Sequence, residues 1–178
     1  MTVANAQADF RDALLGLERG DFSKLDPLFA RDADSDRPCQ VIQWHKAGLF
    51  GDRTEALAEA LTCACFLGRT DAAEYFLNSS VPPSGGAKTG LNAFHWAANR
   101  GQLEAVRLLI LWKAPLQTRS MYGGNVLDTA VWSAINEPKP DHLATIEELL
   151  NAGARLDSEK YPTGHEAIDA ILRQHLGL

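Results

Sequence analysis

The sequence predicts an all-α fold in which about four to five helix pairs stack into a solenoid with short hairpin loops and irregular terminal caps. Two observations predict it: the chain is similar to itself at a fixed offset, and apolar residues recur at helical spacing between glycines. Helix pairs this short cannot bury their apolar faces alone, so each needs a neighbouring pair. The 178 residues are enough for a single domain over residues 1–178 without a disulfide or metal staple.

The internal repeat has a period of 33 residues, and positions related by this shift share a residue class: small, apolar or glycine. The first step aligns Leu61 with Phe94, Ala64 with Ala97 and Gly68 with Gly101, and the second aligns Gly90 with Gly123, Phe94 with Leu127 and Ala97 with Ala130.

The N-terminal part of the chain is less regular. Residues 8–33 are interpreted as a degenerate first helix pair, because residues 20–25 match the middle of a repeat. Residues 36–56 fit no copy, and we expect an irregular insertion there with a short helix at about residues 41–47. The second pair is predicted over residues 57–86.

The clearest copy occupies residues 87–119. Asn92 is predicted to cap its first helix and Gly101 to end it. In the second helix, apolar residues recur at three- and four-residue intervals and form one stripe. We therefore expect a buried set made of Phe94, Ala97, Ala98, Val106, Leu109 and Ile110.

The next copy, residues 120–159, is interrupted. The interval from Asp128 to Ile146 is seven residues longer than the matching interval in the preceding copy. The extra residues include Glu137–Pro140, whose two prolines predict a stiff protruding loop, and Asp141 is expected to cap the helix that follows. Residues 160–178 are predicted to be a capping helix.

Residues 90–109 resemble the ankyrin repeat, whose signature runs glycine, any residue, Thr-Pro-Leu-His, any residue, Ala-Ala, then glycine and a Leu-rich second helix. Two departures occur: Asn92-Ala93-Phe94 replaces Thr-Pro-Leu, and Lys113-Ala114-Pro115 replaces Gly-Ala-Asp. The resemblance covers residues 57–157. It implies a stack of helix pairs that binds another protein through a concave face.

Charge and composition exclude several classes of partner. A net charge of −6 without a Lys/Arg cluster argues against nucleic acid and anionic membrane surfaces. No stretch is apolar for long enough to span a bilayer, and we expect no secretory leader, because residues 1–9 have neither a basic nor an apolar region. The three cysteines are an odd number, so we expect reduced thiols and a cytoplasmic location. We also expect a monomer.

The sequence offers little for catalysis or for metal and cofactor binding. No histidine has a second ligand at zinc-binding spacing, and Cys63 and Cys65 are one residue too close for a redox pair. The resemblance implies a structural role for His95. Asp128 stands where the family has histidine, and we expect it to brace the turn at Asn125. No metal, no cofactor and no catalytic residue is therefore predicted.

The resemblance places the partner-binding positions at the hairpin tips and at the ends of the first helices. We expect the partner to be a protein of unknown identity. Two other functions are alternatives to protein binding: a small hydrolase-like enzyme that uses His and Asp on the concave face, and a self-associating structural unit. Three alternatives stay open for these apolar residues. Trp132 packs under the Glu137 loop, or Tyr122 stacks on its own hairpin, or Phe66 and Leu67 are covered by the irregular segment that contains Leu49 and Phe50. The predicted contact residues are Lys88, Thr89, Leu91, Asn99, Arg100, Arg119, Met121, Tyr122, Trp132, Ser133 and Tyr161, with Glu159 beside the last.

Overall fold

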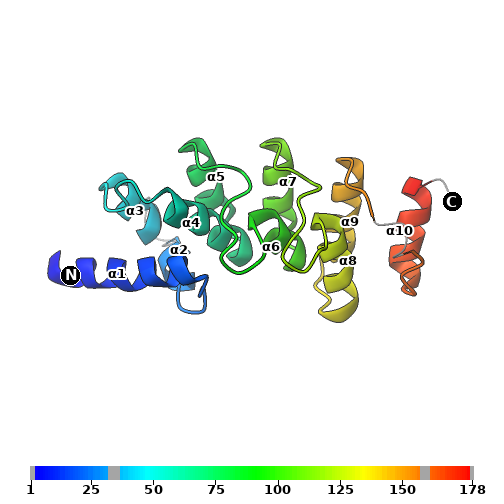
Figure 1. Cartoon of the computed structure of the whole chain (residues 1–178), viewed down its shortest axis with the longest axis horizontal. Helices are drawn as coiled ribbons and strands as arrows, with labels where there is room; N and C mark the ends of the chain where they lie inside the picture. The colour runs from blue at the N-terminus through cyan, green and yellow to red at the C-terminus, as the bar shows by residue number, and fades with distance from the viewer. Residues whose placement is uncertain (1–2, 32–36, 157–160, 177–178) are drawn as a thin grey trace.

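The computed structural model describes residues 3–31, 37–156 and 161–176, and every regular element in these ranges is a helix (Figure 1). The predicted all-α class is therefore confirmed. The helices are α1 (Val3–Arg19), α2 (Asp26–Phe29), α3 (Gln40–Lys46), α4 (Thr54–Leu67), α5 (Thr70–Asn78), α6 (Ala93–Asn99), α7 (Leu103–Leu111), α8 (Val126–Asn136), α9 (His142–Asn151) and α10 (Glu166–Leu176).

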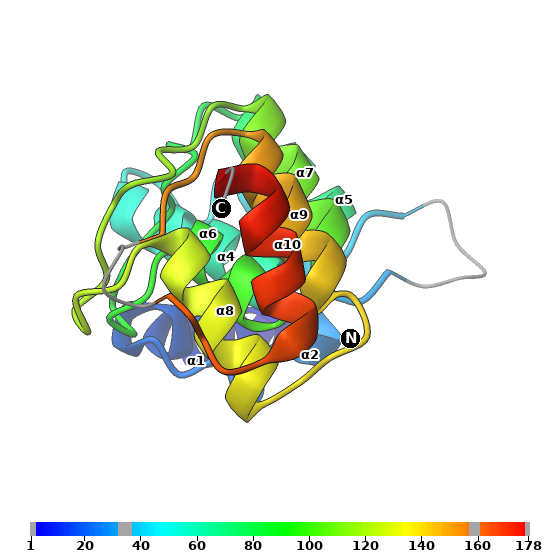
Figure 2. The same ribbon diagram turned by 90° about the vertical axis from the view of Figure 1, so that its right-hand side faces the viewer.

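The helices form a two-layered stack that runs from the N-terminus to the C-terminus (Figure 1). In the inner layer α4 packs on α6 and α6 on α8, and in the outer layer α5 packs on α7 and α7 on α9. Each inner helix also packs on the outer helix that follows it, which makes the helix pair. Viewed from the C-terminal end, α10 lies across the last pair and contacts α9 (Figure 2).

Local hydrogen bonds explain where the inner helices begin. The side chain of Asn92 accepts a hydrogen bond from the backbone N–H of His95 at 3.0 Å, as its predicted capping role requires. Asn125 caps α8 in the same way, and Asp128 returns a bond to the backbone N–H of Asn125 at 2.9 Å. The expected bracing role of Asp128 is confirmed. Asp141 differs, because its side chain makes no capping hydrogen bond to α9.

The core follows the apolar stripes of both layers. Phe94, Ala97, Ala98, Val106 and Leu109 are fully buried, as predicted. Ile110 is only half-buried, and this part of the prediction is wrong. Ala105 takes the inward position, because the buried face of α7 is centred on residues 105, 106 and 109 and Ile110 lies at its edge.

The N-terminal helices close their end of the stack with aromatic residues. Phe10 of α1 makes edge-to-face contacts with Trp44 of α3 and with Phe50, at centroid distances of 5.4 and 5.2 Å. Phe66 packs against Phe22 and Trp96, at 5.8 and 4.9 Å. Phe22, from the segment between α1 and α2, thus packs on Phe66, whereas the ring of Phe50 meets Phe10.

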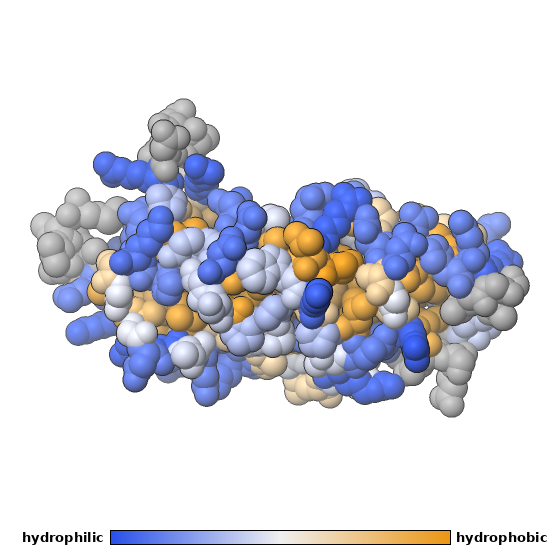
Figure 3. All heavy atoms as spheres, turned by 90° about the horizontal axis from the view of Figure 1, so that it is seen from above, coloured by the Kyte–Doolittle hydropathy of each residue, from blue (hydrophilic) through white to orange (hydrophobic). Residues whose placement is uncertain are grey.

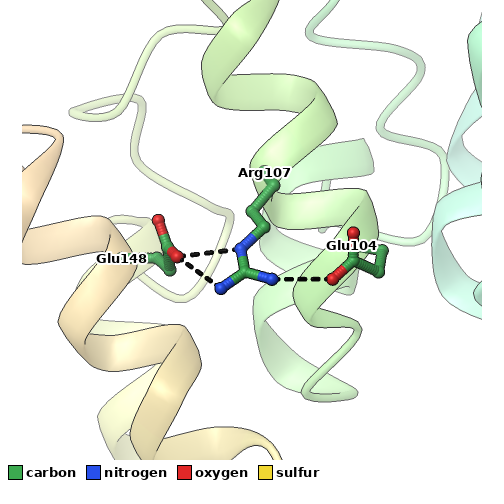
Figure 4. Close-up of polar contacts among 3 residues, drawn as sticks. All are labelled: Glu104, Arg107 and Glu148. Atoms are coloured by element: carbon green, nitrogen blue, oxygen red, sulfur yellow. Dashed lines mark hydrogen bonds and ion pairs between the residues drawn. The ribbon is translucent and has the colours of Figure 1, made fainter.

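Arg107 links neighbouring outer helices (Figure 4). From α7 its guanidinium reaches Glu148 of α9 with two nitrogen atoms, at 2.8 and 2.7 Å, and Glu104 of its own helix at 2.8 Å. These carboxylates raise the pKa of Arg107, the larger effect coming from the bond to Glu148. The repeats are thus joined by polar contacts on the outside as well as by apolar packing inside.

No helix in the described part of the chain combines the length and the apolar character needed to cross a bilayer. Seen from above, hydrophobic residues show through a largely hydrophilic surface in several separate places (Figure 3).

Candidate protein-binding surface

A cleft of about 520 Å³ lies between α8 and the hairpin that precedes it. We call it the aromatic cleft, because two exposed aromatic side chains stand at its edges. Its lining residues are Leu91, Asn99, Ser120, Tyr122, Gly124, Asp128, Thr129 and Trp132.

Backbone hydrogen bonds fix the hairpin that forms one wall of the cleft. Ser120 donates its N–H to the carbonyl of Gly124 at 2.9 Å, and Gly123, with a φ of 83°, donates to the carbonyl of Ser120 at 2.9 Å. Met121 donates to the carbonyl of Gly90 at 3.0 Å, which ties this hairpin to the preceding one. The guanidinium of Arg119 donates to the carbonyl of Gly123 at 2.6 Å. The tip is therefore a defined support for its side chains.

Three large apolar side chains project into solvent at this cleft or beside it. The exposed fractions are 71% for Met121, 75% for Tyr122 and 54% for Trp132. The exposure of Trp132 does not fit the alternative in which it packs under the Glu137 loop. Exposed aromatic and methionine side chains gathered on one face are typical of protein interfaces.

Trp132 separates the aromatic cleft from a second, smaller groove. That groove has a volume of about 300 Å³ and lies between α8 and the segment before α10. Asp128 and Trp132, one helical turn apart on α8, line both depressions. The groove also includes Val131, Ile135, Asn136, Leu156, Pro162 and Thr163.

Two of the residues predicted to contact a partner have buried side chains. Leu91 is 8% exposed and forms the floor of the aromatic cleft. Ser133 is fully buried, and its hydroxyl accepts a hydrogen bond from the amide of Asn99 at 2.6 Å. Ser133 lies about 100° around the helix from Trp132, so it faces α6 while Trp132 faces solvent. Ser133 therefore faces the interior of the stack, whereas Leu91 still lines the cleft.

Four other predicted residues are half-buried: Asn99, whose amide donates to Ser133, and three that make other contacts within the chain. The hydroxyl of Thr89 accepts a hydrogen bond from the indole of Trp96 at 2.7 Å. The guanidinium of Arg100 lies 5.0 Å from the centroid of the Phe66 ring. Tyr161 packs against the core, and Glu159 lies outside the described residues.

Lys88 is exposed at the edge of a different depression, away from the aromatic cleft. The structure therefore places four predicted residues, Leu91, Asn99, Tyr122 and Trp132, on one cleft, with Met121 and Arg119 on the adjoining hairpin.

The aromatic cleft contains one carboxylate and, among its lining residues, no histidine. The nearest repeat histidine, His95, is buried with its Nδ1 atom 2.7 Å from the side-chain oxygen of Asn92. Burial lowers the pKa of His95, and hydrogen bonding to the backbone of Gly124 and Thr118 opposes this shift. The His–Asp arrangement that a hydrolase-like enzyme would need is not assembled in this cleft.

Two buried residues outside the cleft were missed by sequence reasoning. Glu59 accepts a hydrogen bond from the backbone of Lys88 at 2.8 Å, and His142 bridges to α6. Both contacts join segments that are far apart in the sequence, so no local sequence pattern predicts them.

The thiols are also buried. Burial raises the pKa of Cys63 and Cys65, in the second case to about 12. Within the described ranges, no three His, Cys, Asp or Glu side chains are grouped so that they could hold a metal ion.

Comparison with known proteins identifies the repeat. No curated protein matches the chain. The family model described as "Ankyrin repeat" matches residues 89–119, which include the end of the first hairpin, α6, α7 and part of the next hairpin. Members of this family are generally protein–protein interaction modules without enzymatic activity. With its stacked helix pairs and this match, the chain has an ankyrin-type helical repeat fold that contains an ankyrin repeat at residues 89–119.

Proposed function

We propose that this protein binds a partner protein through the aromatic cleft and the adjoining hairpin tip. The observation that carries the proposal is the exposure of Met121, Tyr122 and Trp132. Aromatic and methionine side chains in such positions commonly provide most of the binding free energy of an interface. Arg119 adds a guanidinium to the same rim.

We propose further that the protein acts in the cytoplasm as a monomer and catalyses no reaction. Its net charge of −6 supports a protein partner over nucleic acid or an anionic membrane. The lone carboxylate of the aromatic cleft, Asp128, already holds the N-terminus of α8, which speaks against a role in catalysis.

The test is a comparison of captured proteins between the wild type and a double variant, Tyr122→Ala with Trp132→Ala. Loss of an aromatic anchor commonly costs about 2 kcal/mol or more, roughly thirtyfold in affinity. We expect the double variant to keep its melting temperature and to lose the partner. Leu111→Ala is the matched control, because Leu111 is 76% exposed on α7, away from the cleft.

Two results would contradict the proposal. A double variant that melts several degrees lower yet retains its partner would show that these aromatic residues belong to the core. Size-exclusion chromatography that shows the wild type as a dimer and the double variant as a monomer would favour the self-associating alternative.

A further inference from the structure

A second large cleft lies where the C-terminal end of α1, the first turns of α4 and the hairpin before α6 meet. Its volume is about 460 Å³. We call it the acidic cleft, because four carboxylates and two cations line it. These residues are Glu18, Asp52, Glu55 and Glu59, and Arg53 and Lys88.

Glu59 is the unusual member of this group. It is 2% exposed, and its Oε1 atom accepts the backbone N–H of Lys88 at 2.8 Å. Its Oε2 atom is buried and has no hydrogen-bond partner in the described structure. Burial raises the pKa of Glu59, and the backbone amides of Lys88 and Ala87 oppose that shift. A buried carboxylate oxygen without a donor is costly, so this atom requires an explanation.

The cations of the cleft do not supply the missing donor. The ammonium of Lys88 lies 3.4 Å from Oε2 of Glu55, at the exposed rim. The guanidinium of Arg53 donates to the backbone carbonyl of Phe50 at 3.3 Å. Among the described residues no ion pair engages Glu18, Asp52 or Glu59. The cleft therefore keeps an excess of negative charge.

The chemistry of the cleft selects the class of ligand. An anion would be repelled by the carboxylates, and an apolar group would leave Oε2 of Glu59 without a donor. The described residues offer no cluster of three or more ligands that could hold a metal ion. An N–H-bearing organic cation meets both needs, because it supplies a positive charge and hydrogen-bond donors together.

We propose that the acidic cleft binds a cationic side chain, guanidinium or ammonium, and that Oε2 of Glu59 is its buried acceptor. Lys88 is then the internal competitor that shields the carboxylates while the cleft is unoccupied. That the cation belongs to a protein rests on the proposed function. The hairpin before α6 supplies Lys88 to the acidic cleft and Leu91 to the aromatic cleft, so one partner segment can use both.

The test uses short peptides in place of the unidentified partner. The pentapeptide Gly-Gly-Arg-Gly-Gly, with blocked ends, is titrated into the ¹⁵N-labelled protein and followed by NMR. The backbone amide of Lys88 is the reporter, because it donates to the carboxylate of Glu59. We expect the chemical shift of this amide to change in a saturable way with this peptide, and also with the peptide in which lysine replaces the arginine. The isosteric citrulline peptide, which lacks the charge, should leave it unchanged.

Three variants test the assignment to Glu59. Glu59→Gln keeps the Oε1 acceptor and should weaken binding by about tenfold or more, since the cation loses its charged acceptor. The exposed pair Asp52→Asn with Glu18→Gln should weaken it by about two- to fivefold without touching the core. Lys88→Met should instead strengthen binding by about two- to fivefold, because the competitor is removed. Glu147→Gln on α9 is the control for overall charge.

The results that overturn this proposal are distinct from those that overturn the proposed function. Equal chemical-shift changes with the arginine and citrulline peptides would exclude a cation site. An unchanged affinity for the arginine peptide, both in Lys88→Met and in the double variant Asp52→Asn with Glu18→Gln, would exclude it as well. The same shift with calcium chloride alone would indicate a metal site. Trp132→Ala should leave peptide binding unchanged, so loss of the partner in that variant tests only the aromatic cleft.

Discussion

His142 of α9 donates a hydrogen bond from Nε2 to the backbone carbonyl of Asn99 of α6, at 2.9 Å. Its Nδ1 atom accepts the backbone N–H of Lys139 at 2.9 Å, so Nε2 must carry the proton of a neutral ring. The ring also packs against Gly101, where an added Cβ would lie 3.0 Å from Cδ2 of His142. One side chain thus anchors the inserted loop to the preceding repeat.

The first prediction is that this anchor weakens in acid. Burial is the largest cause that lowers the pKa of His142. The folded state therefore favours the neutral ring, and the resulting stability is present above the unfolded pKa of about 6.5 and is lost as the pH falls below it. Melting temperatures measured from pH 8 to pH 5 should fall, and less steeply in His142→Gln. If the exposed control His165→Gln flattens the curve equally, His142 is not the sensor.

The second prediction compares two leucines of one helix. Leu109 is fully buried and Leu111 is 76% exposed. Leu109→Ala should lower the free energy of unfolding by about 2 to 5 kcal/mol, because it leaves a cavity between the layers. Leu111→Ala should change it by less than about 0.5 kcal/mol. Urea denaturation checks both values, and similar losses in the two variants would mean that the register of α7 is wrong.

The features that sequence reasoning captured are local ones. The pair Asn125 and Asp128 is three residues apart and makes a capping box, so the pattern can be recognised without knowing what surrounds it. The buried stripe of α7 also follows from spacing within one helix. Such signals depend on backbone geometry that every helix shares.

The features it missed depend on which repeats are neighbours. The burial of Ser133 results from its contact with Asn99, 34 positions earlier, and Glu59 meets Lys88 across 29 positions. Leu91 occupies a hairpin position, and its burial depends on how the adjoining hairpin closes over it. A repeat register gives the position of each residue on its own helix pair but not the depth of the cleft between two pairs.

The third prediction concerns metal. Cys63 and Cys65 are fully buried thiols whose pKa burial raises, so they remain protonated at neutral pH. A protonated thiol is a poor zinc ligand. Elemental analysis of the purified protein should therefore find no stoichiometric zinc, and a chelator should leave the melting temperature unchanged. One zinc per chain, with stability lost on chelation, would refute this.

The last prediction separates two asparagines that both cap helices. The side chain of Asn92 meets two groups of His95 that donate, the backbone N–H at 3.0 Å and the ring Nδ1 at 2.7 Å. The amide nitrogen of Asn125 instead donates to the carbonyl of Arg155 at 2.7 Å and to Gln117 at 3.1 Å. Asn125 is therefore both a cap and a link to the next hairpin, whereas Asn92 needs only its oxygen.

Aspartate caps helices as well as asparagine but cannot donate. Asn92→Asp should thus change the free energy of unfolding by less than about 0.5 kcal/mol, because both His95 donors keep an acceptor. Asn125→Asp should lower it by about 1 to 3 kcal/mol, since the carbonyl of Arg155 loses its donor and a second carboxylate is placed beside Asp128. Urea denaturation of the two variants at pH 7 measures both changes in the free energy of unfolding. Equal small losses would mean that Asn125 acts as a cap alone and that the last hairpin is held by other contacts.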